Sequence, residues 1–201
     1  MENDEKSLME RLIRGDEFAF RELVEQNKKN IFYVAYNFTG NMHDAEDISQ
    51  EVFIKVFSRM KTFKRDSKLS SWLYRITINT CIDKYRKKSV FHKKMQVDKK
   101  LEEIPFDSYE QGRIDKSPDR IVEAHQIQRD ITEALKKVSP RERSVFILRH
   151  YNHLSLNDIS KILGISVGAV KSFLFRAIQK LRKELSIYQP NFQTEVSNEQ
   201  V

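Results

Sequence analysis

The stretch that decides the fold is SLNDISKILGISVGAVKSFLFRAIQKLRKEL, residues 155–185. Its first part predicts a short helix, because Ser155 is placed to cap it, Asp158 completes a capping box, and apolar residues then recur at helical spacing. Gly164 predicts the end of that helix, since glycine adopts the positive φ of a helix C-terminus at little steric cost. Ser166 is placed to cap a second helix with a buried apolar face. A helix, a tight turn and a second helix are typical of a helix-turn-helix unit.

The outward face of the second helix suits the major groove of duplex DNA. Placing residues 100° apart puts small, basic and aromatic side chains away from the apolar stripe. Glycine permits close approach, the cations suit phosphates or guanine edges, and the phenylalanine suits a thymine methyl. The alternative is a helical bundle with a solvated basic face, on which an exposed phenylalanine between cations has no use. The candidate duplex contacts are Gly168, Lys171, Ser172, Phe175 and Arg176.

Composition narrows the class of protein. The 201 residues carry 36 Lys and Arg against 29 Asp and Glu, a formal net charge of +7; this fits a polyanionic partner and equally an ordinary soluble protein. Glycine and proline are scarce and no alternating pattern persists, which predicts an almost entirely helical chain. The single Cys81 excludes an internal disulfide. No segment reads as a membrane span or signal peptide, so we expect a cytoplasmic protein without membrane insertion.

The first sixty residues predict three helices. Ser7 and Glu10 suit a capping box for a short helix through Arg14, and apolar residues at helical spacing predict a long helix that ends near Thr39. The third, DAEDISQEVFIKVFSRM (44–60), has a predicted inner stripe made of Ala45, Ile48, Val52, Val56 and Phe57.

Acidic and amide groups crowd the first two turns of that third helix. Acidic residues near a helix start interact favourably with its dipole. In a basic protein, the same cluster also forms a docking patch for a positively charged protein partner. A carboxylate metal site is disfavoured, because neighbouring positions point around the helix. The candidate docking residues are Asp44, Asp47, Gln50 and Glu51.

A second informative stretch is FKRDSKLSSWLYRITINTCIDKYRKKS (63–89). It opens as a basic loop and is predicted to become a helix near Lys68, apolar on more than one face. Aromatic rings beside cations suit single-stranded DNA, because rings stack on unpaired bases while cations follow phosphates. The alternative is a central helix packed on both sides within a bundle. Arg75, Asn79 and Asp83 form a further stripe that suits a mutual polar network.

The pattern divides the chain into four parts: a helical domain over 1–88, a flexible linker over 89–118, a second helical domain over 119–187 and a disordered tail over 188–201. In the second domain, Ser139, Pro140 and Glu142 predict a clean helix start. His150 and His153 are spaced to share a metal, but no third ligand is in view. No nucleophile, metal cluster or phosphate loop argues for catalysis, so we expect neither an enzyme nor a cofactor.

The chain resembles the extracytoplasmic-function (ECF) group of the bacterial sigma-70 family of transcription initiation factors. Residues 44–57 resemble region 2.2, residues 63–87 resemble regions 2.3 and 2.4, and residues 154–181 resemble region 4.2. One departure is Phe173, which stands where many relatives have a basic residue; its position at the edge of the core face favours packing over DNA contact.

The resemblance implies two all-helical domains that act as an RNA polymerase sigma factor, directing core polymerase to promoters and assisting strand opening. It implies that the acidic patch faces the β′ clamp helices, that the β flap is a further polymerase contact, and that an anti-sigma factor controls the chain. It implies that the duplex contacts read the minus-thirty-five element. The implied minus-ten contacts, which hold a flipped base and melted strand, are Phe63, Lys64, Arg65, Ser67, Lys68, Trp72, Asn79 and Arg86.

Two rivals remain open from the residues alone. The first is an autonomous helix-turn-helix regulator that binds a palindromic duplex as a dimer without polymerase. The second is a nuclease that uses the acidic helix, which predicts metal-dependent DNA cleavage.

Overall fold

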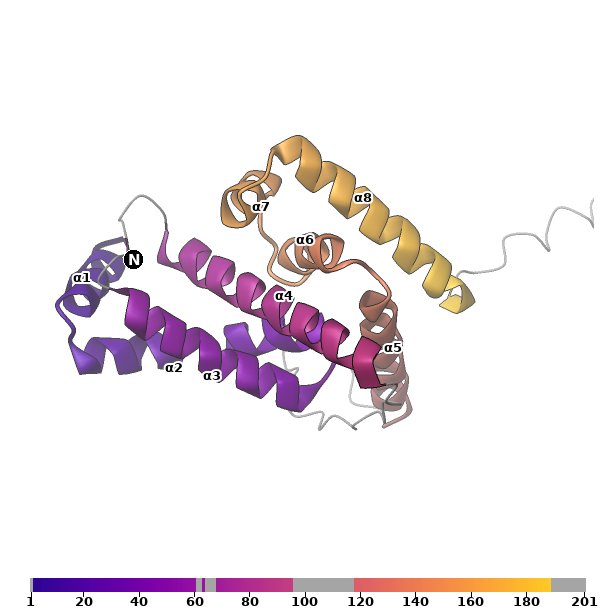
Figure 1. Cartoon of the computed structure of the whole chain (residues 1–201), viewed down its shortest axis with the longest axis horizontal. Coiled ribbons are helices and arrows are strands. Elements are labelled where there is room, and N and C mark those ends of the chain that lie inside the picture. The colour runs from indigo at the N-terminus through magenta and orange to yellow at the C-terminus, as the bar shows by residue number, and fades with distance from the viewer. Residues whose placement is uncertain (1, 61–62, 64–67, 96–117, 189–201) are drawn as a thin grey trace, which may run out of the picture.

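The computed structural model describes residues 2–60, 63, 68–95 and 118–188. Over these ranges the chain is helical and has no strand, which confirms the all-α prediction (Figure 1). The elements are α1 (Glu2–Ile13), α2 (Glu17–Thr39), α3 (Met42–Arg59), α4 (Leu69–Met95), α5 (Pro118–Lys136), α6 (Pro140–His150), α7 (Leu156–Leu163), α8 (Val167–Glu184) and the short 3-10 helix η3 (Ser186–Tyr188).

Short-range capping sets most of these boundaries. The Asp16 carboxylate accepts from the backbone N–H groups of Phe18 and Ala19 at the start of α2, and Asn41 caps α3. Gly40 ends α2 with φ 62°. Two boundaries differ from the sequence expectation. Ser7 lies inside α1 instead of capping it, and α4 continues to Met95, through the first residues of the segment predicted as a linker.

The N-terminal bundle consists of α2, α3 and α4, with α1 against α2. Its core is apolar, and Leu23, Ile48, Val52 and Ile78 are fully buried. The fully buried Ile78 lies on the face of α4 opposite to Leu73, which is also buried. α4 is therefore a central helix packed on two sides.

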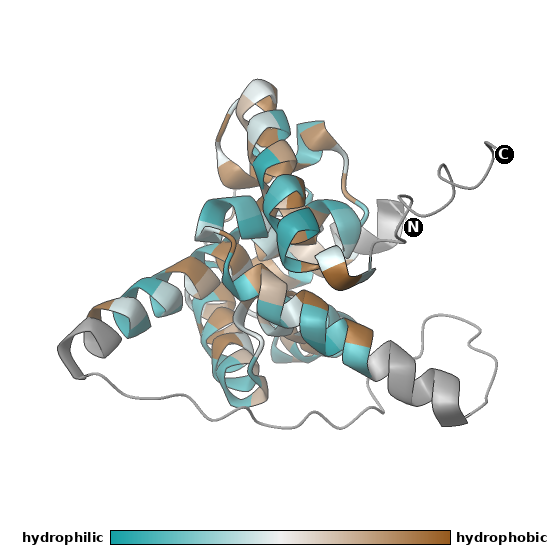
Figure 2. Cartoon of the chain, turned by 90° about the vertical axis from the view of Figure 1, so that its right-hand side faces the viewer, coloured by the Kyte–Doolittle hydropathy of each residue, from teal (hydrophilic) through white to brown (hydrophobic). Residues whose placement is uncertain are grey.

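The C-terminal unit consists of α5, α6, α7 and α8, with α6 and α7 both against α8. The α7–α8 pair is bent by 103° at its turn. Ile159 and Ile162 of α7 and Val170 of α8 are buried at this corner. The predicted helix-turn-helix is therefore present. Figure 2 shows that hydrophobic and hydrophilic residues alternate along its helices.

The two units pack directly on each other along an interface that we call the seam, where α2 and α4 meet α5, α6 and α7. One continuous core cluster runs from the N-terminal bundle into α6, α7 and α8. Arg143 of α6 is 1% exposed and donates to the carbonyl oxygen of Phe38 at 2.6 Å. Its guanidinium also lies over the rings of Phe38 and Tyr85. Arg143 is therefore a buried cation that joins the two halves across the seam.

Within the described residues, no single helix has the length and apolarity needed to cross a membrane. The bent α7–α8 pair meets that criterion only when the two helices are taken together.

Candidate protein and nucleic-acid interfaces

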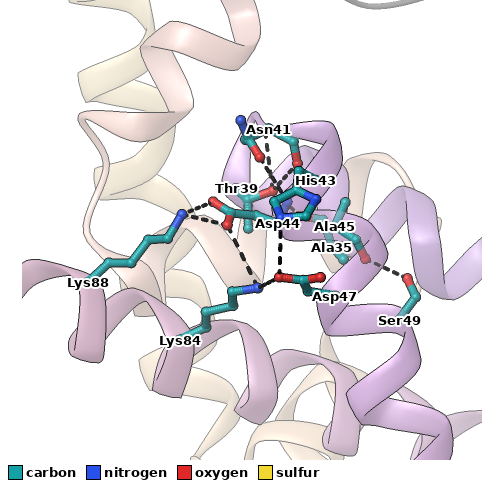
Figure 3. A network of polar contacts seen from close by, with 10 residues as sticks. All are labelled: Ala35, Thr39, Asn41, His43, Asp44, Ala45, Asp47, Ser49, Lys84 and Lys88. Carbon is teal, nitrogen blue, oxygen red and sulfur yellow. Dashed lines mark hydrogen bonds and ion pairs between the residues drawn. The ribbon is translucent and has the colours of Figure 1, made fainter. Parts of the chain in front are cut away.

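The acidic start of α3 is partly neutralised by lysines of α4 (Figure 3). Asp44 is 9% exposed and hydrogen-bonded by Lys88. Lys84 Nζ lies 2.8 Å from Asp47 Oδ2 and 3.7 Å from Asp44 Oδ1. The hydrogen bond from Lys84 lowers the pKa of the Asp47 carboxyl. The four predicted docking residues are thus not equivalent, because Asp44 faces inward while Asp47 stays at the surface.

The other two members of the predicted docking patch also differ. Glu51 is half-buried and pairs with Lys55 at 2.6 Å, whereas Gln50 is exposed. Ile54 and Phe57 are exposed on the same helix, at 69% and 61%. Phe57 was expected in the inner stripe and this expectation is wrong: its ring contacts Phe20 edge-on, with centroids 5.0 Å apart, and otherwise faces outward.

Sequence reasoning missed this apolar extension of the α3 face. Gln50, Ile54 and Phe57 are spaced i, i+4 and i+7 and therefore lie along one side of a helix. That spacing was the available signal. Phe18 of α2 is also exposed, at 74%.

The start of α4 holds the predicted minus-ten residues in different environments. Phe63 is buried and packs on Trp72, with ring centroids 4.9 Å apart, so its ring is not presented to solvent. Trp72 is half-buried, and Lys68 is exposed. The predicted contacts Lys64, Arg65 and Ser67 lie outside the described residues.

Further along α4, Asn79 and Arg86 are exposed and line a cleft of about 600 Å³ between the two units. The cleft is polar and rich in cations, with Lys55, Arg59 and Arg141 also lining it. The expected mutual network of Arg75, Asn79 and Asp83 is replaced by a contact across the seam. Arg75 donates to the carbonyl oxygens of Ile162 at 3.1 Å and Lys161 at 2.6 Å, at the end of α7.

The aromatic residues of α4 also meet the second unit. The Tyr74 hydroxyl accepts from Asn30 at 2.7 Å and from Asn152 at 3.3 Å. Tyr85 is 40% exposed, beneath the Arg143 guanidinium. Burial lowers the pKa of Arg143 to about 10, so its side chain is charged at neutral pH. These contacts bring one face of α4 against α6 and α7.

The helix-turn-helix forms as its sequence predicts. The Ser155 hydroxyl accepts from the Asp158 backbone N–H at 3.1 Å, and Ser166 caps α8 through the Ala169 N–H at 3.1 Å. Gly164 takes the left-handed conformation, with φ 64°.

The predicted duplex-contacting residues of α8 form one exposed surface, with Phe175 at 63% exposure. Phe173 is half-buried, as its position at the edge of the core face predicted. The exposed members are Gly168, Lys171, Ser172, Phe175 and Arg176.

Among the described residues, no group of three or more His, Cys, Asp or Glu is arranged to hold a metal ion. His150 packs on Phe146, and burial, followed by the nearby Arg149 and His153 charges, lowers the pKa of its imidazole. Burial also raises the pKa of the Cys81 thiol. The C-terminal unit carries in addition an apolar groove of about 410 Å³, bounded by Ile131, Phe146, Ile178, Leu181 and Leu185.

Comparison with known proteins matches both units to one family. Residues 23–90 match the family described as sigma-70 region 2, and residues 128–181 match sigma-70, region 4. The chain is 34% identical over 182 residues to the ECF RNA polymerase sigma factor SigW of Bacillus subtilis, covering 90% of this chain and 96% of that protein. It is 29% identical to the RNA polymerase sigma-H factor of Pseudomonas aeruginosa, covering 92% and 95%.

Solved structures share the fold. The sigma factor RpoE of Bartonella quintana, solved in complex with the anti-sigma factor NepR, aligns with a TM-score of 0.64 at 22% identity, over 85% of this chain and 98% of that one. CnrH, solved in complex with the cytosolic domain of CnrY, also aligns with a TM-score of 0.64, at 23% identity over 92% and 99%. The relatives support the sigma-factor prediction and do not support an autonomous regulator.

Proposed function

This chain belongs to the ECF group of sigma-70 RNA polymerase sigma factors, and from that premise we propose which of its surfaces meets which partner during promoter recognition. It binds core RNA polymerase and promoter DNA, and the polymerase supplies the chemistry while this chain contributes binding alone. We propose that it acts in the cytoplasm. The proposed functional units are the N-terminal unit, which ends with α4 at Met95, and the C-terminal unit, which begins with α5 at Pro118.

The main support for the proposal is the exposed face of α8. We propose that this face reads the minus-thirty-five element as duplex. Its first turns offer Gly168 for close approach and Lys171 for phosphate or base edges, while Phe175 projects into solvent at 63% exposure. A large ring left exposed between cations suits a thymine methyl in the major groove. The rest of α8 packs on α6 and α7, which hold this face rigidly outward.

The surface of α3 meets the β′ clamp helices of the polymerase. Asp47 and Gln50 supply exposed polar groups, and Ile54 and Phe57 extend the same face with apolar area. Interfaces commonly place an apolar centre within a polar rim. Asp44 contributes indirectly, because it orients Lys84 and Lys88 from within.

The face of α4 and the loop before it hold the melted minus-ten strand. Lys68, Asn79 and Arg86 offer exposed donors, and Trp72 supports the loop through Phe63. Flipping a base costs a few kcal/mol, which contacts to the extruded base offset. Lys64, Arg65 and Ser67 complete the proposed contact set from the loop.

The apolar groove of α5, α6 and α8 is the proposed contact for the β flap. Ile178, Leu181 and Leu185 line one wall, and Ile131 and Phe146 lie opposite. Control by an anti-sigma factor is also proposed, because the similarly folded RpoE was solved with the anti-sigma factor NepR and CnrH with the cytosolic domain of CnrY.

The test is run-off transcription from fragmented genomic DNA with core polymerase, with and without the chain. We expect promoter-specific transcripts only when the chain is present, and a strong loss with the double variant Lys171→Ala/Phe175→Ala. Lys183→Ala, an exposed cation in the last turn of α8 and outside the proposed contacts, is the matched control. Absence of any chain-dependent transcript would overturn the proposal.

A further inference from the structure

Arg176 is held on two sides by neighbouring side chains. Its Nε lies 3.2 Å from Glu142 Oε1, and its guanidinium carbon lies 4.9 Å from the centroid of the Phe173 ring. Glu142 comes from α6, whereas Phe173 precedes Arg176 by one turn on α8. Lys171, the other proposed contact cation on this helix, has no ion-pair partner in the described ranges.

Glu142 is a fixed anionic support. Its side chain is 6% exposed, and Lys180 Nζ lies 2.6 Å from its Oε2. Burial alone would raise the pKa of the Glu142 carboxyl, but hydrogen bonds from Lys180 and Ser139 outweigh burial and the pKa is lowered. The carboxylate is therefore charged at neutral pH and restrained by two cations of α8 and by Ser139.

These contacts leave the outer edge of the Arg176 guanidinium available. Glu142 meets Nε, and neither terminal nitrogen, Nη1 or Nη2, has a hydrogen-bond or ion-pair partner among the residues that the structure describes. Those two nitrogens form the planar fork that binds O6 and N7 of a guanine. A guanidinium fixed beforehand loses less side-chain entropy when it binds.

We infer that Glu142 and Phe173 are positioning residues that present Arg176 to a guanine edge, so that base preference at one position depends on all three side chains. This rests on the proposed function, in which α8 lies in the major groove. It also gives Phe173 a role. Its ring stands where many relatives have a basic residue, and it orients Arg176 instead of contacting the DNA itself.

The test is selection from a randomised duplex library by the full chain assembled with core polymerase, followed by sequencing of the bound DNA. Arg176→Ala identifies the position that this arginine reads. There we expect the preference for guanine to fall about fivefold or more. At that same position we expect Glu142→Gln and Phe173→Leu to reduce the preference roughly three- to tenfold and to leave other positions unchanged. Replacing that guanine by 7-deazaguanine, which lacks the N7 acceptor, should weaken wild-type binding and leave the Glu142→Gln variant nearly indifferent.

Lys137→Gln is the matched control, because it removes a different ion pair to α8, the one with Glu184, and leaves Glu142 and Arg176 in place. Unchanged guanine preference in both Glu142→Gln and Phe173→Leu would overturn the inference. A uniform loss at all positions, equal in Lys137→Gln, would also overturn it, since it would mean that the ion pairs of α8 only stabilise the fold. If the wild type enriches no sequence, the proposed function itself fails.

Discussion

Asp44 and Asp47 lie one helical turn apart on α3 and have different surroundings. Asp44 is 12% exposed at its side chain and faces two lysines of α4, whereas Asp47 is 48% exposed. We expect Asp44→Asn to lower the free energy of unfolding by ~1–3 kcal/mol, because the largely buried side chain loses its charge-assisted hydrogen bond with Lys88. Urea unfolding monitored by circular dichroism measures this.

Asp47→Asn is the paired variant. Exposed ion pairs contribute little to stability, so we expect unfolding to change by under ~1 kcal/mol and affinity for core polymerase to fall about three- to tenfold. Competition with labelled wild-type chain for core measures that affinity. If Asp44→Asn weakened core binding while leaving stability intact, the inward placement of Asp44 would be wrong.

Glu142 gives stability a specific pH dependence. Its folded pKa is lowered, so its stabilisation is complete above the unfolded value of about 4.3 and is lost as the pH falls through the lower folded value. We expect the difference in unfolding free energy between wild type and Glu142→Gln to be largest near neutral pH and to shrink towards about pH 3. Urea titrations at both pH values measure it, with the exposed Glu46→Gln as control. A difference that grew on acidification would contradict the assignment.

At the scale of elements, the sequence predicted what depends on near neighbours. The caps Ser155 and Ser166 and the stop at Gly164 lie within a few residues of the groups they bind, so α7 and α8 form as expected. The neutralisation of Asp44 was not predictable, because Lys88 is 44 residues away. Arg143 likewise reads as an ordinary helix cation, and only tertiary packing buries it against a carbonyl 105 residues away.

Two glycines that end helices differ in their tertiary surroundings. Gly164 and Gly40 share a positive φ, but a Cβ at Gly164 meets nothing within 4 Å, while one at Gly40 lies 2.7 Å from Thr132 Cγ2 and 2.3 Å from Lys136 Cε. The lysine tip can move aside, but the β-branched threonine is stiff. We expect Gly164→Ala to cost ~1–2 kcal/mol of unfolding free energy and Gly40→Ala to cost clearly more, by chemical denaturation.

A rescue variant isolates the contact between α2 and α5. Thr132→Ser removes the crowding methyl and keeps the hydroxyl that donates to the Gln128 carbonyl. We expect Thr132→Ser to recover part of the stability lost in Gly40→Ala. Equal costs for the two glycine variants, with no rescue, would show that α5 does not lie against α2 in solution.

For the whole molecule, the seam conflicts with simultaneous reading of two promoter elements. Elements named for positions −10 and −35 lie ~25 base pairs apart, about 85 Å at 3.4 Å per base pair. In this structure Arg75 of α4 touches the end of α7 at 2.6–3.1 Å, so the two DNA-facing surfaces are adjacent. Duplex DNA has a persistence length of about 150 base pairs and does not fold back over such a span. The seam must open for both surfaces to engage.

The chemistry of the seam suits an interface that opens. Three of its buried polar atoms, Tyr36 Oη, Arg143 Nε and Asn152 Oδ1, have no hydrogen-bond partner in the parts of the chain that the structure describes. Each unsatisfied buried group costs ~1–3 kcal/mol. Opening lets water reach these atoms and offsets part of the lost apolar contact.

A reversible cross-link tests this requirement. Asn30 and Asn152 touch across the seam, with Nδ2 of Asn152 3.0 Å from Oδ1 of Asn30, and Cys81 is the only cysteine in the chain. In a Cys81→Ser background, Asn30→Cys/Asn152→Cys is joined by a short bis-maleimide with an internal disulfide. We expect cross-linking to reduce run-off transcription with core polymerase at least tenfold, because only chains that can still open bind both elements. Dithiothreitol should restore transcription. The single Asn30→Cys variant, treated identically, should stay active; full transcription from the cross-linked chain would show that the closed arrangement is itself competent.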